Sequence, residues 1–355
     1  GAGPIMMMFL TILGLVTLVP LILGIRKLAG DRWQVLASIP LHSNPDGTWE
    51  AGNFTWYGFI SASAYALSVS VLWILLLALE FQFSEAVILI TAVMAVVIPS
   101  SRKIAQWIEG RKNTFSIGAA AFVGMILCPL LLFIVSQLEL YGRPLPILEA
   151  TAAFTIAYSF GEGLGRLACI SFGCCYGKPV DELTGITQRI FRPLKITYNS
   201  METRKVQYDS GYSQRPLVAI PAITAVLCTV TGLISTALFL SGKFVFALLL
   251  SLGVTQIWRF GSEFLRSDYR GDNSISAYQW MALLGLFGAI VFVSSVSTTG
   301  VVPDLDNALT MVWQPGPILV TQGLWLFIFF FMGWSDVTSS TVSLHLCRNK
   351  VEEAV

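Results

Sequence analysis

The chain repeats long apolar segments, and this pattern restricts its fold more than any other feature. The hydrocarbon core of a bilayer is about 30 Å thick, so a spanning helix needs about 20 mostly apolar residues. Lipid also favours helices, because they satisfy their own backbone hydrogen bonds. We therefore predict an all-α polytopic membrane protein with about nine transmembrane helices, at residues 5–25, 57–79, 86–100, 115–138, 147–172, 216–240, 244–265, 277–298 and 317–334.

The charge content agrees with this interpretation. Charged residues make up 12% of the chain, about half of the roughly 25% that is typical of soluble domains. The net charge of +1 gives no reason to expect nucleic acid as a partner. The two histidines, His42 and His345, lie outside the apolar segments, so we expect no metal site in the membrane and no cofactor.

The connecting segments indicate how the chain is organised. The third apolar segment is short, and it is either tilted, locally thinned or extended through Arg102 to Ile108. The expected parts are a cloning remnant (1–4), an extra helix with an interfacial loop (5–56), a seven-helix core (57–298) with a small polar cap outside the membrane (178–215), an extra helix (299–334) and a loosely ordered polar tail (335–355).

One group of charged residues lies in WRFGSEFLRSDYRG, residues 258–271. Arg259, Glu263 and Arg266 follow i, i+4, i+7 spacing, which predicts one helix face. Glu263 would then bridge both guanidinium groups, and arginine forks match phosphate oxygens in bidentate geometry. The alternative is an ion network that only fixes helix packing.

A second group lies in GEGLGRLACISFGCCYG, residues 161–177, where ions at membrane depth indicate a functional site. Glu162 and Arg166 have the i, i+4 spacing of an ion pair. Its glycines permit close packing, and Gly177 follows a turn out of the membrane. The alternative is a small-residue packing face with one arginine that reaches the interface.

The cysteines of this segment allow three interpretations. Cys169 and Cys174 are better placed to form a disulfide than the adjacent Cys174 and Cys175. An arginine nearby would lower the pKa of a thiol and make it reactive. Buried free cysteines also serve as small apolar residues, so inert packing, a role in the site and redox chemistry all stay open.

These motifs resemble the prolipoprotein diacylglyceryl transferase family. The resemblance is carried by GLGRLACISFGCCYG with its lead SFGEGLGR, by TWYGF (55–59) and by RFGSEFLRSDYRG (259–271), while RPLVAIPA (215–222) is similar in position. It covers about residues 57–298, so the first and last helices are additions. It implies a seven-helix fold that transfers a diacylglyceryl group from phosphatidylglycerol to a protein cysteine thiol, releasing glycerol phosphate.

The resemblance also implies roles for individual residues. Arg166 and Arg259 would bind the lipid phosphate, with Tyr57 as a further catalytic residue, and Gly177 falls on the family's turn glycine. We expect Cys174 as a catalytic residue, in a sharper version a transient covalent acceptor. The residues expected to bind or orient the substrate are Arg102, Glu162, Cys169, Gly177, Glu263 and Arg266.

The chain departs from the family pattern at three places. GAAAFVG (118–124) aligns best with the family's histidine segment, and Val123 then occupies the histidine position. Cys169 and Cys174 stand where well-studied members have asparagine and glutamate. PLVAIP replaces the usual opening of the next helix. Phosphate recognition is therefore expected to be retained, and activation of the acceptor to be changed.

The leading hypothesis is a membrane glycerolipid transferase, with phospholipid and a lipoprotein or other acceptor as partners, in a bacterial inner or cytoplasmic membrane. One alternative is a protein that binds or flips an anionic lipid without chemistry. Another is a membrane thiol–disulfide enzyme. The Lys and Arg distribution predicts a cytoplasmic cap, whereas the resemblance implies the opposite orientation.

Overall fold

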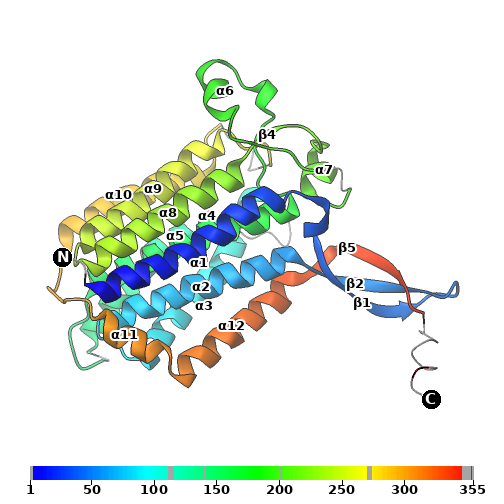
Figure 1. The fold of residues 1–355 in the computed structure, drawn as a ribbon. Helices are drawn as coiled ribbons and strands as arrows, with labels where there is room; N and C mark the ends of the chain where they lie inside the picture. Colours follow the sequence, from blue (N-terminus) through cyan, green and yellow to red (C-terminus); the bar gives the residue numbers. More distant parts are fainter. Residues whose placement is uncertain are drawn as a thin grey trace.

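Nine long helices form the body of the protein in a computed structural model, which describes residues 3–110, 116–139, 141–199, 202–269, 274–345 and 353. They lie side by side in one bundle (Figure 1). Each predicted apolar segment overlaps one of them. The helices are α1 Pro4–Lys27, α2 Trp56–Ala78, α3 Phe83–Glu109, α4 Ile117–Gln137, α5 Ile147–Phe172, α8 Ile220–Leu240, α9 Phe244–Glu263, α10 Ala277–Ser295 and α12 Pro315–Gly333.

Length and composition confirm the prediction of an all-α polytopic membrane protein. Within the described part of the chain, eight of these helices are long and apolar enough to cross a membrane. The ninth, α5, is 26 residues long but carries Glu149, Glu162 and Arg166. The short third apolar segment is part of α3, which continues to Glu109 over 27 residues. Of the alternatives considered for it, the structure therefore shows the extended helix.

Helix α5 is the central helix, and small residues let its neighbours approach. It packs against α2, α8 and α9. A Cβ atom added at Gly163 would lie 2.8 Å from the backbone nitrogen of Thr229 in α8. Such close approach of helix backbones is typical of small-residue interfaces in membranes. The charged residues of α5 are therefore enclosed by other helices and do not face lipid.

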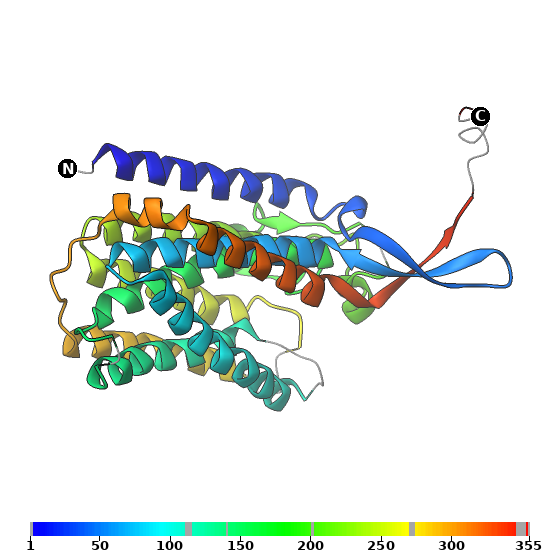
Figure 2. The same cartoon turned by 90° about the horizontal axis from the view of Figure 1, so that it is seen from below.

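A three-stranded antiparallel sheet projects from one end of the bundle (Figures 1 and 2). Its strands are β1 Val35–Ser43, β2 Thr48–Thr55 and β5 Trp334–Ser343, in the order β1-β2-β5. The expected interfacial loop is thus largely a hairpin that follows the short 3-10 helix η1 Asp31–Trp33. The prediction of a loosely ordered tail was wrong for residues 335–343, because they pair with β2. The segments 346–352 and 354–355 lie outside the described residues.

The expected polar cap is a compact subdomain at the same end of the bundle (Figure 1). Its elements are η2 Val180–Glu182, α6 Gly185–Phe191, β3 Lys195–Ile196, α7 Lys205–Ser210 and β4 Leu217–Val218. Arg204 is fully buried and donates hydrogen bonds to the carbonyls of Leu28, Ala29 and Gly30 after α1. Burial lowers the pKa of Arg204. The cap is therefore anchored to the first helix.

The region of the expected last helix contains two helices. The short helix α11 Leu305–Val312 precedes α12 and lies at the opposite end of the bundle from the cap (Figure 1). The backbone nitrogen of Asp304 donates to the carbonyl of Ala78 at the end of α2, at 3.0 Å. Ala308 is fully buried against that end. The additional C-terminal segment is thus packed onto the core.

Candidate functional site

Glu162 lies at the centre of the site and contacts two arginines. Its Oε1 atom accepts hydrogen bonds from Nε of Arg166 at 3.1 Å and from Nη2 of Arg259 at 3.3 Å. Nη2 of Arg166 donates to the same oxygen. The side chains are 5–9% exposed. Two guanidinium groups and one carboxylate give this triad a formal charge of +2 − 1 = +1, which favours an anion as its ligand.

Several buried polar atoms around the triad have no hydrogen-bond partner among the described residues. They are Oε2 of Glu162, Nε of Arg259 and the hydroxyl of Tyr158, which interacts electrostatically with both residues. Buried polar groups in native proteins are nearly always paired. The cluster of such atoms around one buried ion triad therefore indicates a place for a polar ligand group.

A small cavity opens beside the triad, between α5, α8 and α9. Arg166 and Arg259 line it together with Thr224 and Trp258. The indole nitrogen of Trp258 donates to Oγ1 of Thr224 at 2.7 Å. The walls thus combine fixed cations with an aromatic ring and small side chains.

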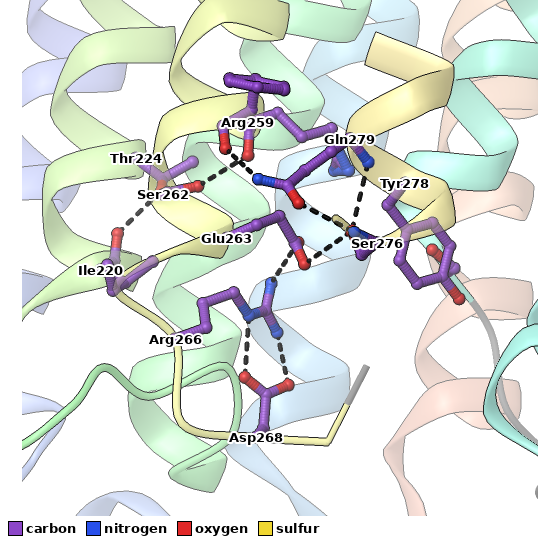
Figure 3. Close-up of polar contacts among 12 residues, drawn as sticks. Ile220, Thr224, Arg259, Ser262, Glu263, Arg266, Asp268, Ser276, Tyr278 and Gln279 are labelled. Carbon is purple, nitrogen blue, oxygen red and sulfur yellow. Dashed lines mark hydrogen bonds and ion pairs between the residues drawn. The ribbon is translucent and has the colours of Figure 1, made fainter. Parts of the chain in front are cut away.

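Arg266 lies beyond the end of α9, between two carboxylates (Figure 3). Its guanidinium donates to both oxygens of Asp268, at 2.8 and 2.6 Å, and lies 3.8 Å from Oε1 of Glu263. Burial lowers the pKa of Arg266, but Asp268, Cys175 and Glu263 together outweigh this and hold the pKa well above its ordinary value. Asp268 was not expected in the site from the sequence.

Glu263 lies near both arginines that it was expected to bridge, at 3.8 Å from Arg266 and in electrostatic interaction with Arg259. Its Oε2 accepts a hydrogen bond from the hydroxyl of Ser276 at 3.4 Å (Figure 3). The carboxylate that bonds directly to Arg259 is Glu162, on another helix. Because α9 ends at Glu263, the regular i, i+4, i+7 face does not continue to Arg266.

Gly177 positions the segment that carries Arg266. Gly177 and Arg266 form an antiparallel β-bridge, and the Lys178 nitrogen donates to the Leu265 carbonyl at 2.8 Å. A Cβ atom at Gly177 would lie 2.5 Å from the carbonyl oxygen of Val218. Gly177 therefore acts through backbone packing.

Three cysteines converge where α5 ends. The Sγ atoms of Cys169, Cys174 and Cys175 all lie within 4.8 Å of one another. Hydrogen bonds from the thiols of Cys169 and Cys174, with Arg266 and Arg166 nearby, hold the pKa of Cys175 well below its ordinary value. Cys174, which the sequence singled out, belongs to this cluster together with Cys169 and Cys175.

Two tyrosines of α2 face this region. The ring of Tyr57 packs against Phe172 at 5.8 Å between ring centroids, and Tyr57 is near Cys169 and Cys174. Tyr65 was missed from the sequence; its hydroxyl would lie 3.6 Å from a Cβ at Gly165, and it interacts electrostatically with Glu162. Its position about two helical turns after Tyr57 was the signal that could have indicated it.

Arg102 and Gly118 differ most from expectation. Arg102 is exposed on α3, and its guanidinium stacks on the ring of Phe331 in α12 at 5.1 Å, so this contact lies outside the triad. Gly118 was not singled out, yet a Cβ there would lie 2.7 Å from Nη1 of Arg259. The start of α4 thus supports the arginine.

Together, the fold and the site define a polytopic membrane protein with a buried cationic centre inside its helix bundle. The sequence profile of the prolipoprotein diacylglyceryl transferase family matches residues 48–295, well over half of the 355 residues. The chain belongs to this family of membrane transferases, which confirms the resemblance. The match runs from β2 to the end of α10 and includes seven of the long helices. No curated protein matches the chain significantly.

Proposed function

We propose that the chain transfers a diacylglyceryl group from phosphatidylglycerol to a thiol of an acceptor protein, with Arg166 and Arg259 binding the lipid phosphate. Membership of a diacylglyceryl transferase family supports this reaction class. The observation that carries the proposal is the buried triad, in which one carboxylate contacts two guanidinium groups and leaves a net positive charge.

The triad suits a phosphate that becomes a leaving group. Arginine forks bind phosphate oxygens in bidentate geometry. Glu162 fixes the direction of both guanidinium groups before the lipid arrives. Donors that are positioned in advance stabilise developing charge without reorganisation, and this stabilisation often contributes more to catalysis than any other effect.

The transfer is a substitution at carbon. The acceptor sulfur, as thiolate, attacks the carbon of the diacylglyceryl group that is bonded to the phosphate oxygen. A sulfur–carbon bond forms, the carbon–oxygen bond breaks, and the electron pair leaves on glycerol phosphate. The thiol proton is released to water or to the product phosphate. Arg166 and Arg259 stabilise the second negative charge that develops on the phosphate as it leaves.

Release of the leaving group tests the proposal. The full chain is placed in lipid nanodiscs with phosphatidylglycerol labelled in its terminal glycerol, and a peptide with a single cysteine is added. We expect labelled glycerol phosphate from the wild type, and release about 100-fold slower from Arg166→Lys and Arg259→Lys.

Arg143→Lys is the matched control, since Arg143 pairs with Glu85 outside the triad. We expect it to keep the wild-type rate. If the wild type releases no glycerol phosphate but still binds the lipid, the proposal fails and the non-catalytic lipid-binding alternative holds.

A further inference from the structure

The thiol cluster is assembled by a specific turn at the end of α5. Gly173 has a left-handed φ of +74°, and the nitrogens of Gly173 and Cys174 donate to the Cys169 carbonyl at 2.8 and 3.1 Å. Cys175 has φ of +56°, which costs a non-glycine residue about 1–2 kcal/mol. Strain of this kind persists mainly where the surroundings fix it, often at functional sites.

We propose that Cys169, Cys174 and Cys175 form a zinc site with three thiolate ligands and one open coordination position. Their Sγ atoms lie within 4.8 Å of one another. Tetrahedral Zn²⁺ has Zn–S bonds of about 2.3 Å, which places ligand sulfurs about 3.8 Å apart. A small closure of the cluster therefore brings three sulfurs onto one ion.

Three protein ligands with an open fourth position are typical of catalytic zinc rather than structural zinc. The expectation of no metal site rested on the positions of the two histidines. The structure instead brings three thiols together at the end of α5. His42 lies in β1 and His345 follows β5, so neither imidazole belongs to the arginine site. Among the described residues, Cys169, Cys174 and Cys175 form a group whose sulfur atoms are close enough to bind one metal ion.

The location indicates what the fourth position binds, and this step rests on the proposed function. Arg166 belongs to the triad, and it also interacts electrostatically with Cys169 and Cys175 of the thiol cluster. A coordinating thiol is deprotonated by the metal. The acceptor thiol therefore binds the zinc as thiolate, gives its proton to solvent and attacks the phosphatidylglycerol carbon held beside Arg166. The metal then supplies the activation that a histidine base would otherwise provide.

Metal content tests the site without reference to activity. The full chain is purified anaerobically in detergent with excess Zn²⁺, washed, and its zinc measured by mass spectrometry. We expect about one ion per chain in the wild type. Loss of a residue that only orients a ligand weakens metal binding by about 10–100-fold, so loss of a ligand itself, in Cys169→Ser, Cys174→Ser or Cys175→Ser, should weaken binding by at least about 100-fold.

Cys128→Ser is the matched control, because Cys128 is buried in α4 away from the cluster, and it should retain the ion. Equal zinc in the wild type and the three cluster variants overturns the site. A Cys169–Cys174 disulfide in the protein as isolated under reducing conditions also overturns it, in favour of the redox alternative. Preferential binding of Cu⁺ in a three-coordinate site overturns the open position.

Cobalt substitution tests the fourth position. The Co²⁺ form should show intense thiolate charge-transfer bands, and the single-cysteine peptide should shift them whereas its serine analogue should not. An unchanged spectrum overturns acceptor binding at the metal. Because this readout needs no lipid, a peptide shift without glycerol phosphate release would show that the proposed transferase function fails while the zinc site stands.

Discussion

Glu162 in α5 and Arg259 in α9 are 97 residues apart in sequence, yet Oε1 of Glu162 lies 3.3 Å from Nη2 of Arg259 in the buried centre of the bundle. Arg166 shares the same oxygen. This contact joins two long helices and fixes two cations side by side. Substitutions around the triad and around the cap therefore have distinct expected effects.

Replacing Glu162 by glutamine leaves two buried guanidinium groups without their carboxylate. Removal of one partner from a buried ion pair costs about 3–5 kcal/mol, so we expect a lower unfolding temperature and slower glycerol phosphate release. Asp181→Asn is the control, because Asp181 is largely exposed in its pair with Arg215 and such surface pairs contribute about 0–1 kcal/mol. Equal effects of the two substitutions would contradict a special role for the triad.

Adding a methyl group at Gly118 should displace Arg259. The new Cβ would lie 2.7 Å from Nη1 of Arg259, so Gly118→Ala is expected to slow release of glycerol phosphate, with a smaller effect on stability. Gly124→Ala, on the same helix, is the control, because its Cβ would be 3.8 Å from the nearest atom, in Val97. Wild-type activity of Gly118→Ala would show that Arg259 tolerates the shift.

Replacing the guanidinium of Arg204, which has several N–H donors, by the single ammonium group of lysine should loosen the cap. Arg204→Lys cannot reach the carbonyls of Leu28, Ala29 and Gly30 together, and hydrogen bonds to charged groups contribute about 1.5–3 kcal/mol. We expect faster proteolysis within residues 178–215. Arg215→Lys, which changes a partly exposed arginine paired with the exposed carboxylates of Asp181 and Glu182, should be cleaved at the wild-type rate. Unchanged protection of Arg204→Lys would argue against anchoring by α1.

Truncating Arg102 tests a residue that the sequence placed in the site. Its guanidinium stacks on Phe331 and is exposed, and an exposed cation–π contact contributes about 0.5–1 kcal/mol. Arg102→Ala is therefore expected to leave glycerol phosphate release unchanged and to lower stability by no more than that amount. A large loss of activity, measured beside Arg166→Lys, would restore Arg102 to substrate binding.

The sequence was informative where the physical signal is local. Apolar length located all nine long helices, because the thickness of a bilayer imposes it within one segment. The i, i+4 spacing of Glu162 and Arg166 predicted their ion pair, since both lie on one helix face. Arg102 was placed in the site as an arginine at a helix end, and nothing local in the sequence showed that its side chain meets Phe331.

Contacts between distant segments were decided by the tertiary structure alone. Glu263 lies four residues from Arg259, but packing of α5 against α9 gives that arginine to Glu162. β5 forms because its backbone groups pair with β2, which lies near the other end of the sequence. The sequence by itself determined a helical membrane protein with costly buried ions. The turn at the end of α5 brings the three thiols together locally. Which ions meet followed only from packing, because side-chain partners on different helices depend on how the helices cross.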